Sequence, residues 1–566
     1  MNGADLVANW INEQGLKKIF TFPGGTIAPI YDALVRKGVE IICTRHEQGA
    51  GYAALAIARL TRKPQVVMVT SGPGVTNLIT VVADAFFDST PLIAITGQVG
   101  TGDLLSGRKV RQTGFQQVDT VALMKPVAKA VFQPRSASEL PAILLEAFAL
   151  TTDGRFGPVV IDLPMNVQNE IASEETITRI NQQQNNSGDK ADVEQKIKQA
   201  ADLIASAKRP VFFTGQGLFL ADAVESFRQI AELRSIPVVN SILGLGSMPT
   251  DNELALGFIG HTGNQYAALA VNQADLVIAV GVRLDVRQTG SLPEKFLQNG
   301  TLIRIDVDNT EIEYSRVAMD LAICSDAKDV LDKLLNILKE KPISDLQAWH
   351  NQIREWKVKF PLEVESHEDV IKPQQIITAV DRLSASKAAL VCTGVGSHQQ
   401  WAARHFTYDY PSRVLLTSGG HGAMGYDLPS AIGAQLERPN DLVICFVGDG
   451  SFQINIQELQ TIIDLHTPIK IFVLDNQRLA MVSQFQNHNW GADPTTGNKS
   501  NPDFAKVAEA YGIKAWTLRK QEEIDDVVRA ALAYEGPVLV HCVIASEENV
   551  VPMLLAGQTL DKMWPY

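Results

Sequence analysis

The chain has 566 residues, of which 45% are hydrophobic and 20% charged, and its formal net charge is −13. This length predicts three or four domains of about 150 residues each, and the acidic balance argues against a nucleic-acid partner, because phosphate binding requires basic patches. The five scattered cysteines indicate a reducing cytoplasm, and neither an apolar run of about eighteen residues nor a signal-like N-terminus points to membrane insertion or secretion.

The first part of the chain alternates apolar, strand-like runs with helix-length segments. Residues 39–43 and 65–70 are apolar runs, and between them residues 50–60 form an alanine-rich segment that predicts a helix. Glu47 stands between the first run and this helix, so it is either a first-turn acid favoured by the helix dipole or a ligand-binding group at the end of a strand. The polar stretch 181–188 predicts a linker that ends the first domain at about residue 180.

The middle part contains further strand-like runs at residues 211–214 and 276–280. The first of them enters a loop with Gly215 and Gly217. This loop is a weak dinucleotide-binding signal, because Leu220 replaces the third glycine of the G-x-G-x-x-G pattern. A charged stretch at residues 339–372 separates the middle part from the last. The breaks predict domains at residues 1–180, 190–340 and 370–566, each a doubly wound α/β domain with a mainly parallel sheet.

The last part contains the most informative motif, Gly448-Asp449-Gly450-Ser451, followed 27 residues after Asp449 by Asn476. Apolar runs at 442–447 and 469–474 place Asp449 and Asn476 at the ends of two strands, where ligands of parallel sheets collect. Mg²⁺ prefers oxygen ligands, which Asp449, the Asn476 amide and the Arg478 main-chain carbonyl would supply, and the glycines allow a diphosphate close to the backbone. Gly-Asp-Gly alone would also fit an ordinary strand-turn-helix loop.

These motifs resemble the thiamin diphosphate (ThDP) enzymes, and more narrowly the catalytic subunit of acetohydroxyacid synthase, also called acetolactate synthase. The resemblance covers almost the whole chain, with long matches at residues 22–25, 45–50, 70–74, 96–99, 423–425 and 474–479. It implies pyrimidine-binding, FAD-binding-like and diphosphate-binding domains in that order. It also implies ThDP, Mg²⁺ and FAD as cofactors, and a carboligase that decarboxylates pyruvate and transfers the two-carbon unit to a second 2-keto acid.

The resemblance assigns roles residue by residue. Glu47 would hold the aminopyrimidine ring and favour its imino tautomer. Met424 would wedge the two cofactor rings into a bent conformation, although core packing is its alternative. The implied ThDP-binding residues are Pro23, Gly24, Glu47, Gly396, Ser397, His398, Gly422, Met424, Asp449, Gly450, Ser451 and Asn476, and Gln116 is a further catalytic residue. The implied FAD-binding residues are Arg155, Gly215, Gly217, Gly263, Arg283, Asp285, Asp306 and Asp326, the alternative being a vestigial pocket. The implied substrate residues are Phe115, Met165, Arg287 and Phe485.

The departures from the family pattern cluster on the acceptor side. A lysine is missing from residues 163–166, Val286 replaces an aspartate before Arg287, Phe485 replaces a tryptophan, and His261-Thr262 replaces Met-His. His421 replaces a leucine. It is either a proton relay beside the pyrimidine or a packed histidine. Arg287 itself would bind the acceptor carboxylate, or form a salt bridge to another domain or to the flavin.

The loop between residues 99 and 115 is about six residues longer than in the family pattern and carries Arg108, Lys109 and Arg111. These cations would meet phosphates, which opens the alternative of a nucleotide-activated keto sugar as acceptor, or they belong to a solvated surface loop. A pyruvate oxidase or decarboxylase is a further alternative, and a non-catalytic binding module conflicts with the retention of Glu47 and Asp449. The family builds its ThDP site from two subunits, so we expect a homodimer or a dimer of dimers. A separate regulatory subunit is a possible partner.

Overall fold

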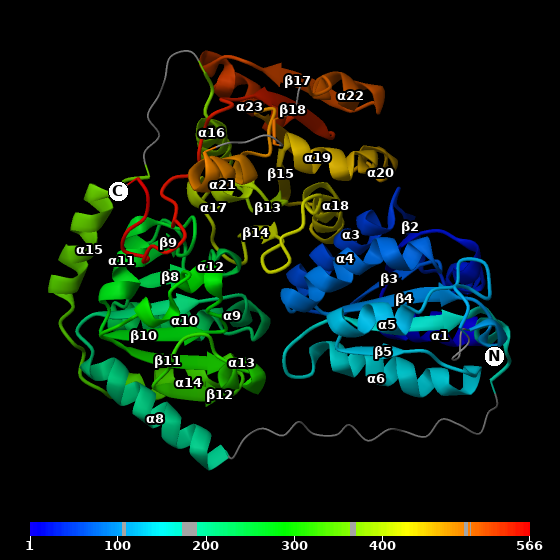
Figure 1. Cartoon of the computed structure of the whole chain (residues 1–566), viewed down its shortest axis with the longest axis horizontal. Helices are drawn as coiled ribbons and strands as arrows, with labels where there is room; N and C mark the ends of the chain where they lie inside the picture. The colour runs from blue at the N-terminus through cyan, green and yellow to red at the C-terminus, as the bar shows by residue number, and fades with distance from the viewer. Residues whose placement is uncertain (105–108, 173–189, 363–369, 492–495, 498–499, 566) are drawn as a thin grey trace.

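A computed structural model of the chain describes residues 1–104, 109–172, 190–362, 370–491, 496–497 and 500–565. It contains three six-stranded sheets, and every strand pair in them is parallel. This confirms the predicted fold class of three doubly wound α/β domains. In Figure 1 the N-terminal domain is blue to cyan, the middle domain green and the C-terminal domain yellow to red.

The N-terminal sheet has the strand order β2-β1-β3-β4-β6-β5. Strands β4 and β6 are buried along their whole length, as expected for a parallel sheet covered by helices on both faces. The strands are β1 (Lys18–Phe22), β2 (Glu40–Cys43), β3 (Gln65–Val69), β4 (Leu92–Gln98), β5 (Ala130–Phe132) and β6 (Val159–Pro164). The helices are α1 (Gly3–Glu13), α2 (Ala28–Arg36), α3 (Glu47–Thr61), α4 (Pro73–Phe87), α5 (Thr120–Met124), α6 (Leu140–Thr152) and α7 (Met165–Asn169).

The middle sheet has the order β12-β11-β10-β7-β8-β9, so its central strands β10 and β7 come from the two predicted apolar runs. Its strands are β7 (Pro210–Thr214), β8 (Val238–Asn240), β9 (Ala255–Phe258), β10 (Leu276–Val280), β11 (Thr301–Asp306) and β12 (Leu321–Cys324). Its helices are α8 (Lys190–Ser206), α9 (Gly217–Leu220), α10 (Val224–Arg234), α11 (Gln265–Gln273), α12 (Val286–Thr289), α13 (Asn309–Glu313), α14 (Ala327–Lys339) and α15 (Gln347–Lys359).

The C-terminal sheet has the order β14-β13-β15-β16-β18-β17, and β15 pairs with β16 so that Gly448 lies opposite Leu474. Its strands are β13 (Ala389–Thr393), β14 (Arg413–Thr417), β15 (Leu442–Gly448), β16 (Lys470–Asp475), β17 (Lys514–Leu518) and β18 (Val538–Val543). Its helices are α16 (Pro373–Ser384), α17 (Ser397–His405), α18 (Asp427–Glu437), α19 (Asp449–Ile454), α20 (Leu459–Asp464), α21 (Ala480–Trp490), α22 (Phe504–Ala510) and α23 (Ile524–Ala533).

The N-terminal and C-terminal domains share one hydrophobic core. Helix α3 packs against α18 so closely that a Cβ added at Gly433 would lie 2.1 Å from the carbonyl oxygen of Ala53. Tyr52 and Tyr426 pack edge to face in this contact, with ring centroids 5.1 Å apart. The two helices begin at Glu47 and Asp427, so this contact determines how the predicted site residues of the two domains are oriented.

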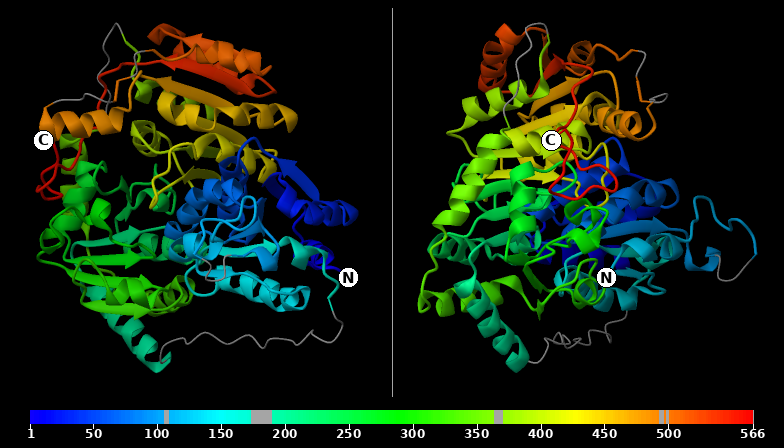
Figure 2. Two further views of the ribbon diagram at one scale, coloured as in Figure 1. Left: turned by 45° about the vertical axis from the view of Figure 1, so that its right-hand side comes forward. Right: turned by 60° about the vertical axis from the view of Figure 1, so that its left-hand side comes forward.

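The segment after the middle sheet belongs physically to the middle domain. Helix α15 buries Trp349 and Trp356 in the same core that takes up Leu554 and Met563 from the end of the chain. Figure 2 shows this red C-terminal segment lying against the green middle domain. The predicted linker at 181–188 lies outside the described residues, and the predicted domain boundaries stay predictions. Among the described helices, none has the length and apolar character that a membrane span would need.

Candidate active site

Two neighbouring strands of the C-terminal sheet end in the predicted metal-binding residues. Asp449 follows β15 directly and begins α19, and Asn476 follows β16. Both side chains are buried, with 2% and 5% exposure. Because β15 and β16 are paired in parallel, the carboxylate and the amide lie at the same edge of the sheet. The described residues contain no group of three His, Cys, Asp or Glu side chains that could hold a metal, so a cation here would also need amide, main-chain or ligand oxygens.

The turn after β16 has a strained backbone that its neighbours hold in place. Gln477 has a φ of +57°, and its N–H donates to Asp475 Oδ1 at 3.1 Å. The Arg478 N–H donates to Asn476 Oδ1 at 3.3 Å, whereas the Arg478 guanidinium pairs with Glu547 at 2.6 Å. The arginine side chain is thus bound elsewhere, and its carbonyl accepts from the Ala480 N–H at 2.9 Å, so the metal role of this carbonyl stays a prediction.

A hydrogen-bonded network behind this site was not predicted from the sequence. The Asn501 amide donates to Asp449 Oδ2 at 2.6 Å and to Asp475 Oδ1 at 2.7 Å. Asp475 Oδ2 also lies 2.8 Å from His541 Nε2. Although burial raises the pKa of Asp475, the hydrogen bonds from His541 and Asn501 keep it below its ordinary value. Only a signal that links positions 52 apart in the sequence would have found Asn501.

Two buried polar groups at the start of α17 have no hydrogen-bond partner within the part of the chain that the structure describes. These are Ser397 Oγ and His398 Nε2. Burial lowers the pKa of His398 to about 3, so the imidazole is neutral. A Cβ added at Gly448 would lie 3.0 Å from His398 Nδ1, which places this ring directly beside the Asp449 turn. Buried polar atoms without partners cost free energy, so these two groups favour a polar ligand at this position.

The predicted pyrimidine-side residues of the C-terminal domain are connected to the same turn. Ser451 Oγ accepts from Gly425 N–H at 2.8 Å and donates to Asp427 Oδ2 at 2.5 Å. Burial raises the pKa of Asp427 to about 6. The Met424 methyl group lies 3.4 Å from the position of a Cβ added at Gly450. The structure therefore brings Met424, Gly450 and Ser451 together, and Gly422 lies two residues away in the same loop with a φ of +76°.

The predicted site residues of the N-terminal domain gather at the ends of its own strands. Glu47 is 3% exposed and begins α3, and its Oε2 accepts from the Asn77 amide at 2.9 Å. Gly24 packs against Thr70, and a Cβ at Gly72 would lie 2.8 Å from the carbonyl oxygen of Gln116, which has a φ of +62°. Pro23 is exposed beside Gly24.

Sequence reasoning also missed Glu458. This residue belongs to the C-terminal domain, and its side chain contacts the start of α3 in the N-terminal domain. Its Oε1 accepts from the Arg45 N–H at 3.0 Å, and its Oε2 accepts from the Thr461 hydroxyl at 2.6 Å. Burial raises the pKa of Glu458 to about 7. A Cβ at Gly49 would lie 2.2 Å from Glu458 Oε1, so the turn that carries Glu47 is held directly against this carboxyl.

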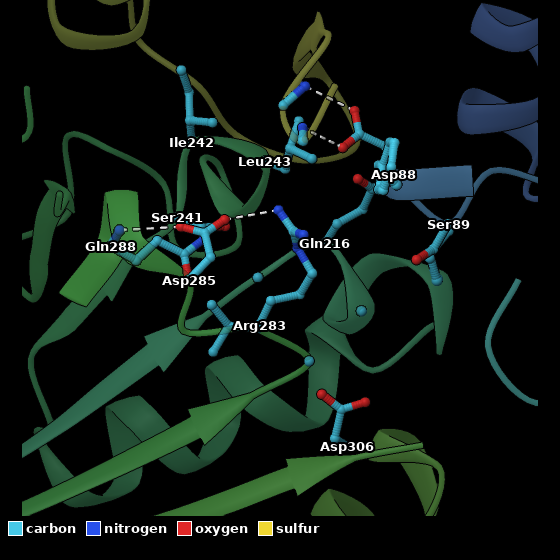
Figure 3. A pocket seen from close by; sticks show the side chains of 18 of the residues that line it. Asp88, Ser89, Gln216, Ser241, Ile242, Leu243, Arg283, Asp285, Gln288 and Asp306 are labelled. Atoms are coloured by element: carbon cyan, nitrogen blue, oxygen red, sulfur yellow. Dashed lines mark hydrogen bonds and ion pairs between the residues drawn. The ribbon is translucent and has the colours of Figure 1, made fainter. Parts of the chain in front are cut away.

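A long pocket runs between the three domains and is lined by most of the predicted FAD residues. Figure 3 shows Arg283, Asp285 and Asp306 around it, together with Asp88, Ser89 and Gln216. The lining includes Arg155, Gly215, Gly217, Arg283, Asp285, Asp306 and Asp326, whereas Gly263 does not line it but follows Thr262, which does.

The glycines of this pocket mark a close approach of backbone segments. A Cβ at Gly215 would lie 2.2 Å from the carbonyl oxygen of Gly281, and one at Gly217 would lie 2.7 Å from the Gly281 Cα. At the far end, burial raises the pKa of Asp306, while Arg155 pairs with Asp308 and Glu311. The pocket is lined by residues of all three domains, from Asp88 and Arg155 to Asp326 and Gly420, so it has the form of a site for an extended ligand.

A second pocket adjoins the first and contains two of the predicted substrate residues. Arg287 and His261 line both pockets, and Phe485 lines the second. The backbone N–H of His261 donates to the Arg287 carbonyl at 2.7 Å. Burial, together with the Arg287 charge, lowers the pKa of the His261 imidazole to about 4. No carboxylate of the described residues forms an ion pair with the Arg287 guanidinium, which disfavours the interdomain salt bridge within one chain.

The remaining predicted residues lie away from this pocket. Phe115 is 86% exposed, and Met165 begins α7 with a half-buried side chain. His421 is exposed and stacks on Phe87, with ring centroids 5.7 Å apart, so it is not packed in the core. Lys109 and Arg111 are exposed, and Arg108 lies outside the described residues.

The chain matches three family models that together span most of it. They are the thiamine pyrophosphate enzyme N-terminal TPP binding domain at residues 1–123, the central domain at 197–334 and the C-terminal TPP binding domain at 394–542. Thiamine pyrophosphate is the same compound as ThDP.

Similar proteins in bacteria, plants and yeast match along the whole chain. The acetolactate synthase isozyme 3 large subunit of Escherichia coli is 36% identical, over 100% of this chain and 98% of the relative. Acetolactate synthase 2 of Nicotiana tabacum, a chloroplast protein, is 37% identical over 98% of this chain and 84% of the relative. The mitochondrial acetolactate synthase catalytic subunit of Saccharomyces cerevisiae is 36% identical over 99% and 83%.

Proposed function

Because this chain belongs to the acetolactate synthase family of thiamine pyrophosphate enzymes, we propose that it decarboxylates pyruvate and joins the two-carbon unit to a second 2-keto acid. One observation carries the proposal. Buried Asp449 and Asn476 lie at the sheet edge where the His398 ring packs beside Gly448. In the described part of the chain, Ser397 Oγ and His398 Nε2 have no hydrogen-bond partner. A magnesium diphosphate would give Ser397 and His398 the acceptor that they lack and would bring the cation to the oxygens of Asp449 and Asn476.

The donor set fits ThDP and Mg²⁺. Asp449, Asn476 and the Arg478 carbonyl would bind the cation, and diphosphate and water oxygens would supply its other ligands. Ser397 and neutral His398 would each donate a hydrogen bond to the diphosphate. When bound, ThDP supplies the nucleophilic carbon and the electron sink that decarboxylation needs.

Glu47 would hold a proton at the pyrimidine ring. Its carboxyl is 3% exposed and oriented by the Asn77 amide, so water competes little for the hydrogen bond to the ring nitrogen. Met424, beside Gly450, would support the bent arrangement of the two rings. These residues orient and hold protons, while the bond-making carbon belongs to the cofactor.

The acceptor would bind at the second pocket. The Arg287 guanidinium has two parallel N–H donors for a carboxylate, and its position in the wall between the two pockets is compatible with a small 2-keto acid. Phe485 lies at the same pocket, where its side chain is 43% exposed and packs edge-on against Trp490. Its size would therefore limit the group that the acceptor carries next to its carbonyl.

The interdomain pocket fits FAD. Gly215 and Gly217 allow the loop after β7 to pack directly against Gly281, and the backbone of all three glycines lines the pocket, where a dinucleotide phosphate would approach. Asp306 at the end of β11 offers a carboxylate to ribose hydroxyls. The net reaction consumes no electrons, so the flavin would serve as a structural cofactor. Flavin bleaching by pyruvate would instead favour an oxidase.

The protein would act as a homodimer or a dimer of dimers. The resemblance supports this, because the family builds its ThDP site from two subunits, with the residue corresponding to Glu47 from one and the residue corresponding to Asp449 from the other. The relatives are named large or catalytic subunits, which supports a separate regulatory partner. The cytoplasmic location stays a prediction.

The test supplies ThDP, Mg²⁺, FAD and pyruvate to the purified protein and follows pyruvate and acetolactate by mass spectrometry, with and without 2-ketobutyrate. Stoichiometric acetolactate formation is expected, and acetaldehyde or acetate as the main product would contradict the proposal. Slow pyruvate loss without acetolactate would favour the keto-sugar acceptor. At present nothing favours it, because the pockets described above do not include the exposed Lys109 and Arg111.

A further inference from the structure

The loop that carries Gly422 and Met424 is anchored by a side chain of a different domain. Asp88 follows the last residue of α4 in the N-terminal domain and is 4% exposed. Its Oδ2 accepts from the Gly419 N–H at 2.8 Å, and its Oδ1 accepts from the Gly420 N–H at 2.7 Å. One carboxylate thus holds two successive N–H groups of the loop, in the arrangement by which backbone amides bind an anion.

Arg59 forms an ion pair with this carboxylate. Its guanidinium is buried, donates to Asp88 and to the Thr417 carbonyl, and lies over the Tyr426 ring at 5.4 Å from the centroid. Thr417 is the last residue of β14, so Arg59 and Asp88 together fix both the end of the strand and the beginning of the loop. A buried ion pair of this kind restricts geometry strongly, because moving either partner leaves an uncompensated charge.

The second half of the loop is fixed by its own serine. Ser418 Oγ accepts from the Gly422 and Ala423 N–H groups, each at 3.0 Å. With Asp88, two side chains therefore bind four backbone N–H groups between residues 419 and 423. Four of the five N–H groups from Gly419 to Ala423 are thus held by side chains of the protein itself.

Asp88 also lies at the interdomain pocket. Asp88, Gly419 and Gly420 all line it, and Figure 3 shows the bonds from Asp88 to the loop at the upper edge of this pocket. Phe87, the neighbour of Asp88, stacks on His421. The carboxylate thus lines the proposed FAD pocket and also holds the loop that would receive the ThDP rings.

We propose that Asp88 is a positioning residue for ThDP: it holds the Gly422–Met424 loop in the conformation that receives the cofactor rings. This rests on the proposed function, because it takes that loop as the ring-binding element. It also separates two parts of the cofactor. The rings depend on Asp88, whereas the magnesium diphosphate depends on Asp449, Asn476 and the start of α17, which the Asp88 carboxylate does not contact in the described residues.

The test measures two dissociation constants by calorimetry on the full-length Asp88→Asn protein, one for ThDP and one for inorganic pyrophosphate, both with Mg²⁺. Removing the charge weakens two charge-assisted hydrogen bonds, and we expect the ThDP constant to rise about tenfold or more. The pyrophosphate constant should stay within about twofold of wild type. The ratio of the two constants is the informative quantity, because general loosening of the domains would weaken both ligands in parallel.

Matched variants keep the test decisive. Asp153→Asn is the control, since Asp153 follows α6 of the same domain in the same way but is exposed, and both constants should equal those of wild type. If Asp88→Asn does not fold, Gly420→Ala takes its place in the test. Its Cβ would lie 3.0 Å from Asp88 Oδ1 and from the Phe87 Cβ, so it disturbs the same contact. Unchanged ThDP affinity, or equal weakening of both ligands, overturns the inference. Wild-type protein that binds neither ligand would overturn the proposed function as well, which distinguishes the two failures.

Discussion

Replacing Gly433 by alanine tests the contact on which both halves of the predicted site depend. A Cβ at this position would lie 2.1 Å from the Ala53 carbonyl oxygen and 2.9 Å from the Ala53 Cα, whereas ordinary contact begins at 3.4 Å. Both atoms belong to the backbone of α3, so no side-chain rotation relieves the clash. Helices α3 and α18 must move apart, and the buried core between them must open.

The expected cost follows from two opposing terms. Overpacking a well-packed core costs about 1–3 kcal/mol, and a clash with backbone belongs at the upper end of this range. Alanine is favoured over glycine in a helix interior by about 0.5–1 kcal/mol. The net loss in the free energy of unfolding should therefore be about 1–2.5 kcal/mol. Since α3 begins at Glu47, its displacement should also weaken ThDP binding.

Gly51→Ala provides the matched control in α3, the helix that Gly433 of α18 packs against. Its Cβ would meet only side-chain methyl groups of Val81 and Leu78, at 2.7 and 2.9 Å, and these groups can adjust. Thermal unfolding and ThDP titration of both variants, with and without cofactor, measure the difference. A Gly433→Ala protein with the melting temperature and ThDP affinity of wild type, or one less destabilised than Gly51→Ala, would refute the reasoning.

Four further predictions concern single side chains. Glu47→Gln should bind ThDP but consume pyruvate about 10²–10⁴-fold more slowly, because it removes the acid-base group; wild-type turnover in a pyruvate assay would contradict its role. Asp449→Asn should raise the Mg²⁺ concentration needed for half-maximal ThDP binding at least about tenfold, because one charged ligand is lost. Metal titrations measure this concentration. Arg287→Lys should raise KM for the 2-keto acid about tenfold with a smaller change in kcat, because the ammonium cannot bind a carboxylate through two parallel bonds. Initial-rate kinetics measure both constants, and an unchanged KM would mean that Arg287 does not bind the acceptor. Burial and the Arg404 charge lower the pKa of His405 to about 3 in the folded protein. In the unfolded chain its pKa is about 6.5, so below this pH the unfolded state binds the proton more readily and the wild type should lose stability. His405→Gln should lack this contribution of at most about 1.4 kcal/mol per pH unit, and parallel urea-unfolding results for the two proteins from pH 7 to pH 5 would contradict it.

Local patterns were sufficient for the sheets. The apolar runs at 65–70, 276–280 and 442–447 became β3, β10 and β15, because strands buried on both faces must be apolar at every position. The predicted helix at 50–60 begins earlier, at Glu47. His46 Nδ1 accepts the Gln48 N–H at 3.1 Å and caps it, a histidine cap that the usual sequence signals do not include.

The same reasoning explains which site residues were predictable. Asp449 and Asn476 each follow a strand within one residue, so sequence position alone placed them at a sheet edge. Contacts between residues far apart in the chain give Asn501, Glu458 and Asp88 their roles. No local sequence spacing predicts such contacts. The bond between Asp88 and Gly420 joins positions 332 apart.

The sequence by itself determined the three parallel sheets, the strand ends at which ligands collect, and the resemblance that assigned roles to matching residues. These follow from hydrophobic periodicity and turn chemistry, which act over a few residues. The tertiary structure alone decided that Asp88 and Arg59 hold the loop before Met424 and that His421 stacks on Phe87. It also decided that Arg287 faces a pocket without a carboxylate partner among the described residues. Such contacts depend on how the domains pack, and packing is set by the summed shape and charge of whole surfaces.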